Sequence, residues 1–150
     1  QRAGELERGR VVEVPEAADP VAPGSHVHLV RPARRVRDGG DEVLREFAMR
    51  LRRQVRGADL VFRFGGEEFV VAMPDTDAEV AARVAESVRA AMEGVPFTLS
   101  GGKEVRITAS VGVTTIRDDS DTISEITKRA DKALYEAKNG GRNRAVQLAA

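Results

Sequence analysis

The sequence contains no cysteine. This absence excludes a disulfide framework, a thiolate metal site and a thiol nucleophile, and it fits a reducing compartment. The sequence also lacks an apolar run near the roughly 18 residues that a membrane-spanning helix needs, and no signal-peptide pattern opens it. We therefore expect a soluble, cytoplasmic domain that makes no contact with a membrane.

An excess of charge of either sign is also missing. Lys plus Arg and Asp plus Glu each number 24, so the formal net charge is zero. This balance argues against a partner held by bulk electrostatics, such as duplex DNA, and we expect no nucleic-acid partner. With 150 residues the chain is long enough for one domain with its own core. Since it begins with Gln1 rather than methionine, we expect it to be part of a longer protein.

The chain changes texture near residue 38. Residues 1–37 show little periodicity, whereas apolar residues further on recur at helical spacing or alternate. The spacing predicts three helices: one over residues 41–55, one from a Thr76/Glu79 capping box to Gly94, and one from Asp121 or Thr122 to Gly140 and Gly141. It also predicts strands over residues 60–64, 69–73, 97–99, 104–115 and 144–148. The strand over 104–115 alternates strictly, so we expect one buried face. The third helix is expected to point Ile123, Ile126, Ala130, Ala133, Leu134 and Ala137 inward.

The order of these elements predicts an α+β fold. Its hairpins require antiparallel pairing, and the helices between them can pack on the resulting sheet. We therefore expect a mixed, mainly antiparallel sheet with helices packed on it. Such a sheet needs a further strand before Asp41, for which the candidates are residues 10–14 and 26–30.

The turn between the first two predicted hairpin strands carries two glycines followed by two acids, Glu67 and Glu68. A tight turn with solvated charges is the simpler interpretation. However, the flanking strands are almost purely apolar, and adjacent residues of an extended chain point to opposite faces. Glycine also permits close approach of a bulky ligand, while carboxylates hold a hard cation, as Mg²⁺-nucleotide sites require.

Residues 64–69, Phe-Gly-Gly-Glu-Glu-Phe, resemble the signature of the GGDEF domain, the catalytic domain of diguanylate cyclases, in its GGEEF variant. Other stretches that match in order are residues 40–44, 56–59, 73–76, 110–113, 128–131, 135–138 and 141–143. The closest likeness is to cyclases linked to response regulators. The resemblance implies a palm-like fold related to nucleotidyl cyclases, with residues 38–150 as the GGDEF domain. Residues 1–37 would be a divergent segment that supplies the first strand or strands of the same domain.

The resemblance also implies a reaction. Two domains of a homodimer each hold one GTP with Mg²⁺ (or Mn²⁺), and the 3′-hydroxyl of each nucleotide attacks the α-phosphate of the other, giving cyclic di-GMP. Glu67 would be a metal ligand and catalytic, and Glu68 would be the second signature acid, close to the reacting hydroxyl. The longer protein would carry a sensory or receiver domain.

The resemblance implies that five residues bind GTP: Asp41 and Leu44 contact guanine, Gly66 allows close approach of the nucleotide, and Lys138 and Arg142 bind the triphosphate. Asp41 is equally suited to cap a helix, and the two cations to complement a helix dipole. Arg56 and Asp59 match the family's Arg-x-x-Asp site, which binds cyclic di-GMP as an inhibitor. Their alternative is a surface ion pair worth roughly 0–1 kcal/mol.

Upstream of residue 38 the family pattern breaks. Family members carry a metal-binding Asp and a guanine-binding Asn there. An ungapped count puts Gly24 and Pro32 at these positions, and a two-residue deletion instead puts His26 and His28 at the acids of that strand. Mg²⁺ prefers oxygen ligands, and we interpret the two histidines as non-ligands. Degeneration, fusion and a sequence error all remain open as the origin of the break.

Two functions follow from the intact and the broken parts of the pattern. The intact hairpin favours a cyclase with product inhibition. The missing metal carboxylate favours a degenerate, impaired domain that acts as a receptor for cyclic di-GMP or GTP. A purely structural dimerisation domain would leave Glu67, Lys138 and Arg142 unexplained.

Overall fold

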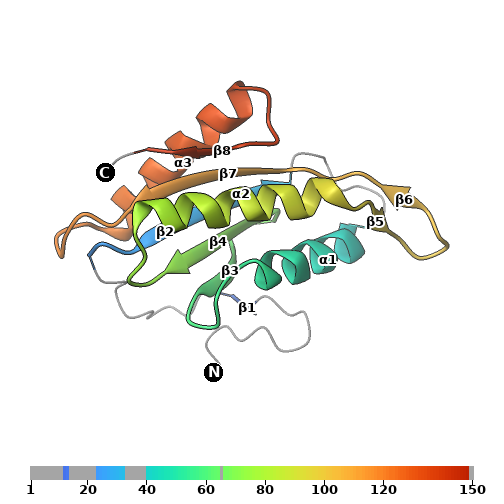
Figure 1. Ribbon diagram of the computed structural model, residues 1–150, viewed down its shortest axis with the longest axis horizontal. Coiled ribbons are helices and arrows are strands. Elements are labelled where there is room, and N and C mark those ends of the chain that lie inside the picture. Colours follow the sequence, from blue (N-terminus) through green and yellow to red (C-terminus); the bar gives the residue numbers. More distant parts are fainter. Residues whose placement is uncertain (1–11, 14–22, 33–39, 65, 149–150) are drawn as a thin grey trace.

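The computed structural model describes residues 12–13, 23–32, 40–64 and 66–148. Its main sheet has six strands in the order β1-β3-β4-β2-β7-β8, and β5 and β6 form a separate hairpin (Figure 1). The strands are β1 (Val12–Glu13), β2 (His26–Pro32), β3 (Leu60–Phe64), β4 (Glu68–Met73), β5 (Phe97–Thr98), β6 (Glu104–Val105), β7 (Ala109–Thr115) and β8 (Ala145–Gln147). β1 and β8 pair in parallel with their neighbours, and the other pairs are antiparallel. The expected mixed, mainly antiparallel α+β sheet is confirmed.

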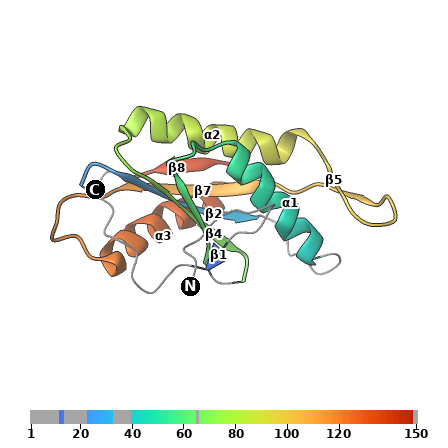
Figure 2. The ribbon, with the colours of Figure 1, turned by 90° about the horizontal axis from the view of Figure 1, so that it is seen from below.

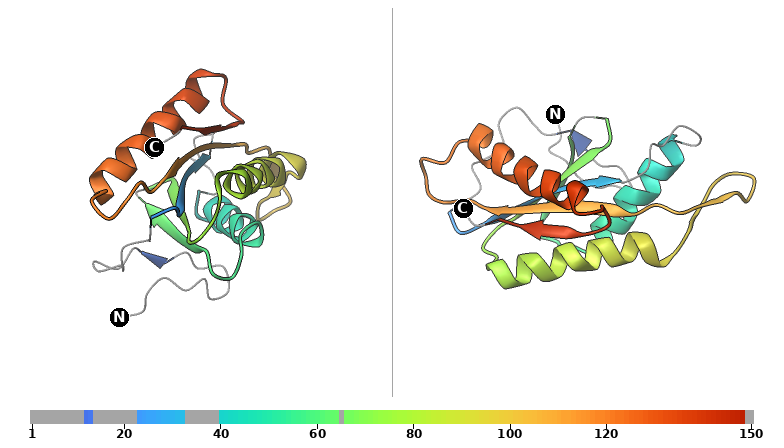
Figure 3. Two further views of the ribbon diagram at one scale, coloured as in Figure 1. Left: turned by 60° about the vertical axis from the view of Figure 1, so that its left-hand side comes forward. Right: turned by 90° about the horizontal axis from the view of Figure 1, so that it is seen from above.

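Three helices cover the two faces of this sheet. α1 (Gly40–Arg53) and α2 (Ala78–Gly94) lie on one face, and α3 (Ile123–Asn139) lies on the other (Figures 2 and 3). The main core lies under α1 and α2, where Phe47 of α1 stacks on Phe69 of β4 at 5.3 Å between ring centroids. A smaller cluster of Leu29, Ala130 and Leu134 lies under α3. Within the described ranges, no helix has the length and apolar character needed to cross a membrane.

Both candidate first strands are present, in different places. β1 falls within residues 10–14 and pairs with β3 at one side of the sheet. β2 covers the second candidate and lies between β4 and β7, with five and seven paired residues respectively. The segment that departs from the family pattern therefore contributes the central strand.

Arg50 of α1 is a buried arginine. Its Nη1 and Nη2 donate to the carbonyl oxygens of Val95 and Pro96 at 2.6 and 3.0 Å, directly after α2. Its guanidinium also lies 3.8 Å from the ring centroid of Phe97 and pairs with Glu46. Arg50 therefore satisfies carbonyl groups where α2 ends and joins α1 to α2.

Four details of the predicted elements are wrong. Asp77, not Thr76, caps α2, because its side chain accepts from the Val80 N–H. Gly94 is the last residue of α2 and the extended Val95 follows it, so no left-handed glycine cap forms. Ile123 is 80% exposed because the Thr122 cap places it at the start of α3, beyond the sheet.

The fourth correction concerns the predicted strand over residues 104–115. It is two strands, β6 and β7, separated by residues 106–108. β7 is buried on both faces rather than one, since α2 covers one side and α3 the other. Alternation in the sequence marks only the face that carries apolar residues. The other face of β7 is buried too, but it carries small and hydroxyl residues such as Gly112 and Thr114.

Candidate functional site

The hairpin between β3 and β4 carries the acidic pair. Phe64 pairs with Glu68, and Gly66 and Glu67 belong to the turn between the strands. The guanidinium of Arg63 closes this turn, because its Nη2 and Nε donate to the Gly66 carbonyl oxygen at 2.7 and 3.3 Å. Glu67 and Glu68 are both half-buried. The hairpin thus holds two adjacent carboxylates at one end of the sheet.

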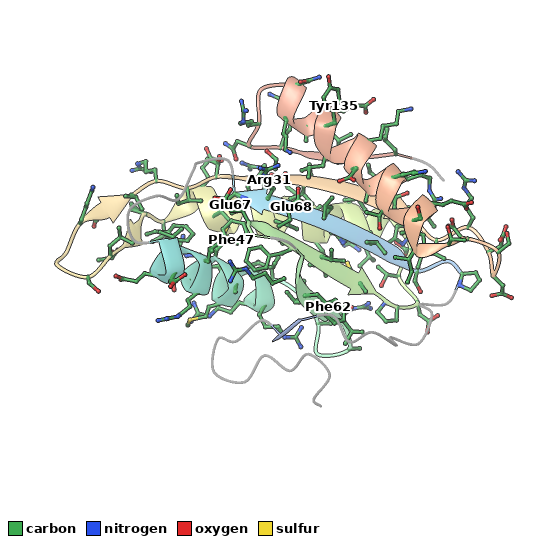
Figure 4. The ribbon with its side chains drawn as sticks, turned by 180° about the vertical axis from the view of Figure 1, so that it is seen from behind. Arg31, Phe47, Phe62, Glu67, Glu68 and Tyr135 are labelled. Atoms are coloured by element: carbon green, nitrogen blue, oxygen red, sulfur yellow. The ribbon has the colours of Figure 1, made fainter. Side chains whose placement is uncertain are left out.

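Glu68 faces a cation on the central strand. β2 pairs with β4 up to Val30 opposite Phe69, so the next residue, Arg31, lies beside Glu68. Nη1 of Arg31 is 3.5 Å from Oε1 of Glu68, and the two side chains are 40% and 24% exposed. Figure 4 shows Arg31, Glu67 and Glu68 gathered at this end of the sheet. The central strand therefore presents a guanidinium to the acidic pair.

The C-terminal end of α3 brings further positive charge to the same side of the sheet. Lys138 is half-buried. Desolvation and the nearby Arg31 lower the pKa of the Lys138 ammonium, while Glu68 opposes the shift. Arg142 follows the Gly140 cap, at φ 61°, and is exposed. Lys138 is thus within electrostatic reach of Glu68, and Arg142 lies on the turn beyond it.

Asp41 and Leu44, the residues expected to contact guanine, lie in the first turns of α1. Asp41 is the second residue of the helix and is exposed, whereas Leu44 is half-buried against the main core. The stacking of Phe47 on Phe69 fixes this helix beside the start of β4. Because Phe69 directly follows Glu68, the first half of α1 and the hairpin lie toward the same end of the fold.

The side chains near the hairpin do not form a complete site for a divalent cation. Across the described residues, no three His, Asp or Glu side chains come together to hold a metal ion. Glu67 offers one carboxylate, and Glu68 already has Arg31 beside it. Mg²⁺ prefers several oxygen ligands, and a guanidinium beside one of two carboxylates opposes its binding. The donor set that the described residues provide therefore does not fit the metal that the family implies.

The two histidines of β2 do not supply the missing ligands. His26 Nδ1 donates to the Thr76 carbonyl oxygen at 2.5 Å, and its Nε2 accepts from the Thr115 hydroxyl at 2.9 Å. His28 Nε2 donates to the Ala81 carbonyl oxygen at 2.8 Å. Both rings are buried under α2, opposite Met73 and Val71 of β4 rather than opposite Glu68. Burial also lowers the pKa of His28 to about 4, so its ring is neutral near pH 7.

Neither the ungapped count nor the two-residue deletion predicts which residue of β2 lies beside the hairpin. Gly24 donates its N–H to the Ile116 carbonyl oxygen, beyond the end of β2 that is remote from Glu68. Pro32 is buried and pairs with Ala109. The residue beside the hairpin is Arg31, and its place in an arginine-rich stretch of the sequence did not predict that it would lie next to Glu68.

Arg56 and Asp59 form a hydrogen-bonded turn between α1 and β3. Nη2 of Arg56 donates to Asp59 Oδ1 at 2.9 Å, and the Arg56 N–H donates to Oδ2 at 2.8 Å. Nη2 also donates to the Pro74 carbonyl oxygen and the Thr76 hydroxyl. The Asp59 side chain is fully buried, whereas 48% of the Arg56 side chain is exposed, and their hydrogen bond raises the pKa of Arg56. Asp59 therefore orients Arg56, and Arg56 is the member that solvent reaches.

The Arg56 site and the acidic hairpin occupy opposite ends of β4. Arg56 contacts the residues just after Met73, whereas Glu68 is the first residue of the strand. Six residues of extended chain separate the two ends by roughly 17 Å. The structure therefore contains two separate candidate sites linked by one strand.

The acidic hairpin at the end of a mainly antiparallel sheet, with helices on both faces, defines an α+β domain of the nucleotidyl-cyclase type. The family described as "Diguanylate cyclase, GGDEF domain" matches residues 37–144. The response regulator PleD of Caulobacter vibrioides is 51% identical over 114 residues, which cover 75% of this chain and 25% of PleD. The chain belongs to the GGDEF family of diguanylate cyclase domains.

Solved structures agree with this assignment. The GGDEF domain of YfiN (TpbB) from Pseudomonas aeruginosa superposes with a TM-score of 0.77 at 32% identity, covering 83% of this chain and 81% of that chain. The GGDEF domain of DgcB from Caulobacter crescentus, solved in complex with c-di-GMP, gives a TM-score of 0.75 at 26% identity, covering 82% of this chain and 77% of that one. The chain spans about a quarter of the length of PleD, so it corresponds to one part of that protein.

Proposed function

We propose that this domain is a slow diguanylate cyclase that condenses two GTP molecules to cyclic di-GMP across a homodimer. The observation that carries the proposal is the acidic hairpin, Gly66 to Glu68, with Lys138 of α3 within electrostatic reach of it. This arrangement puts carboxylates and a phosphate-binding cation at one end of the sheet. The match to the family described as "Diguanylate cyclase, GGDEF domain" spans residues 37–144 and therefore includes this hairpin, Lys138 and Arg142, which supports the same role here.

Each residue then has a role that its position allows. Asp41 accepts from the guanine edge, Leu44 packs against the base, and Gly66 lets the nucleotide approach the hairpin. Lys138 and Arg142 neutralise the triphosphate, which lowers the cost of bringing two nucleotides together. The first turns of α1 carry Asp41 and Leu44, and the last turn of α3 carries Lys138, whose ammonium interacts electrostatically with Glu68 of the hairpin.

The bond changes are those of a nucleotidyl transfer. The 3′-hydroxyl oxygen of one GTP attacks the α-phosphorus of the other, the bond to the β,γ-pyrophosphate breaks, and the hydroxyl proton goes to a base. Glu68 is the candidate for that base because it is half-buried at the hairpin and its carboxylate can accept a proton. Two such transfers, one in each direction, close the ring and release two pyrophosphates.

Mg²⁺ (or Mn²⁺) is the cation expected with these nucleotides, and Glu67 is the carboxylate that this chain offers to it. One carboxylate falls short of the charge and the oxygen ligands that a triphosphate-bound cation needs from a protein. Because stabilisation of developing charge dominates this class of reaction, we expect a rate lower by orders of magnitude than that of a site with a full set of ligands.

Arg56 and Asp59 are proposed to bind the product and inhibit. Arg56 would donate to a phosphate or to guanine in a bidentate manner, held in place by the buried Asp59. The complex of the DgcB domain with c-di-GMP supports a binding function for a domain of this fold. Arg56 is exposed on its outer side, so a ligand can reach it without unfolding the turn.

A second candidate is a receptor that binds cyclic di-GMP or GTP without turnover. The observation that favours it is Arg31, which lies where a carboxylate would complete a cation site with Glu67 and Glu68. In either role we expect a cytoplasmic domain attached to a sensory or receiver domain, as the name of PleD, a response regulator, indicates for that protein.

One experiment separates these functions. The protein is incubated with GTP and Mg²⁺, and cyclic di-GMP is quantified by mass spectrometry, with Glu67→Gln as the inactive control. Binding of cyclic di-GMP is measured by calorimetry for wild type, Arg56→Ala and the exposed control Arg53→Ala. Slow product formation lost in Glu67→Gln supports the cyclase. Absence of product with tight binding that only Arg56→Ala abolishes supports the receptor, and absence of both product and binding refutes both functions.

A further inference from the structure

Three polar residues form a row across the sheet on the face that α3 covers. Ser110 of β7 pairs with Arg31 of β2, and Arg31 lies beside Glu68 of β4. Residues opposite each other on neighbouring strands point to the same face. The face is that of α3, because Gly112, two residues along β7 from Ser110, packs against the α3 backbone.

The end of α3 lies over this row. The Thr114 hydroxyl of β7 accepts from Arg129 of α3, and Gly112 packs against Ala130 and Leu134. Residues nearer the start of β7 therefore lie against residues nearer the C-terminal end of α3. Two strand residues span roughly 6.6 Å, slightly more than the 5.4 Å of one helical turn. Ser110 therefore faces the turn that holds Lys138, which already interacts electrostatically with Arg31 and Glu68.

Arg31 is held loosely in this row. Its closest approach to Glu68 is 3.5 Å, longer than the roughly 2.7–2.9 Å of a charge-assisted hydrogen bond. With 40% of its side chain exposed, the guanidinium has freedom to meet an anion from solvent. A planar guanidinium binds phosphate oxygens in a bidentate manner, so Arg31 is a suitable phosphate ligand.

The Ser110 hydroxyl gives a second, independent indication of a bound oxygen. Its Oγ is buried and has no hydrogen-bond partner among the described residues. Buried polar groups nearly always have a partner, and an unpaired one costs free energy. A phosphate oxygen between Arg31 and Lys138 would give the hydroxyl an acceptor and would offset the two neighbouring positive charges.

We propose that Arg31, Lys138 and Ser110 form a phosphate-binding cluster in which the guanidinium takes the place of a divalent cation, so that the domain binds the phosphates of GTP without Mg²⁺. The inference rests on the proposed function only in that GTP binds at the hairpin. This proposal explains why Glu67 and Glu68 do not form a metal site although Arg31 and Lys138 are in place to bind phosphate. The ligand class is a nucleoside triphosphate with its charge balanced by the protein.

The test measures binding of α,β-methylene-GTP, which cannot release pyrophosphate, by calorimetry in excess Mg²⁺ and in EDTA. Wild type should bind in EDTA within about threefold of its affinity in Mg²⁺, since cations of the protein supply the charge. Arg31→Ala should weaken binding in EDTA by about tenfold or more, as expected for a lost hydrogen bond to a charged group. Arg83 is an exposed arginine of α2, so the matched control Arg83→Ala should leave the affinity for the analogue in EDTA unchanged.

A reverse substitution strengthens the test. Arg31→Asp should abolish binding in EDTA and make binding depend on Mg²⁺, because it replaces the guanidinium with a carboxylate beside Glu67 and Glu68. Wild-type binding that requires Mg²⁺ would overturn this inference and leave the proposed function intact. No binding of the analogue in either medium, with cyclic di-GMP still bound, would overturn both the inference and the nucleotide site. The wild-type comparison needs no variant, so it holds even where a substitution impairs folding.

Discussion

The backbone of α3 packs closely against Gly112 of β7. A Cβ atom added there would lie 2.4 Å from the Leu134 nitrogen and 2.5 Å from the Ala130 carbonyl oxygen. Both are backbone atoms of the helix, so no side-chain rotation relieves the overlap. In Gly112→Ala, α3 must recede from β7 by about 1 Å to restore ordinary contact of 3.4 Å.

The loss of stability in Gly112→Ala follows from the packing between α3 and the sheet that this movement loosens. A gap of 0.5–1 Å forfeits roughly a quarter to a half of the dispersion energy between facing atoms. The buried residues of α3, among them Leu134 and Ala137, would all lose part of their contact with the sheet. Overpacking usually costs 1–3 kcal/mol, and a clash with backbone on two sides belongs at the upper end, about 3 kcal/mol. For a chain of this length, that lowers the Tm by roughly 6–12 °C.

Thermal and urea unfolding followed by far-UV circular dichroism measure this effect. Gly94→Ala is the matched control, because nothing lies within 4 Å of a Cβ atom at the last residue of α2. It should be neutral or raise the free energy of unfolding by about 0.5 kcal/mol. A Gly112→Ala protein that melts within about 1 °C of wild type would refute the close approach of α3 to β7.

Two further predictions concern other buried groups. Arg50→Met should lower the free energy of unfolding by about 2–3 kcal/mol in urea denaturation, since it leaves carbonyl groups after α2 without their charged donor; the exposed control Arg53→Ala should change it by under about 0.5 kcal/mol. Burial lowers the pKa of His28 to about 4, whereas an unfolded histidine titrates near 6.5. The unfolded state therefore binds the proton first as the pH falls, and stability present above pH 6.5 declines by up to about 3 kcal/mol toward pH 4. Urea midpoints measured across this window should fall less steeply in His28→Gln, and equal slopes would contradict the burial argument.

Periodicity predicted the strongly patterned part of the fold. The hairpin with Gly66 and Glu67, the three helices and the last strand all appear, because each depends on local spacing of apolar residues or on glycines. One of the errors lies where two neighbouring residues compete for one role. Thr76 and Asp77 can each cap α2, and the Thr76 hydroxyl instead accepts from Arg56, twenty residues earlier. Such a long-range partner cannot be read from local sequence.

The candidate site was predicted only on the side that carries local motifs. Glu67, Glu68 and Lys138 were identified from resemblance; in the fold the Lys138 ammonium interacts electrostatically with Glu68, and the roles of the three residues stay a prediction. The position of Arg31 beside Glu68 was not predicted, because strand register sets which residue of β2 lies next to Glu68. A one-residue change of register would have presented the other face of β2, so no motif in a single sequence specifies this neighbour.

The central place of β2 has a consequence for the choice of fragments. The match to the family begins at residue 37, five residues after β2 ends at Pro32. A fragment cut at that boundary would lose the strand that joins β4 to β7, and the sheet would open in its middle. Two apolar edges with unpaired N–H and C=O groups would then face solvent, a known cause of aggregation. The family resemblance therefore ends inside the folding unit, and the divergent segment supplies the strand on which the matching part depends.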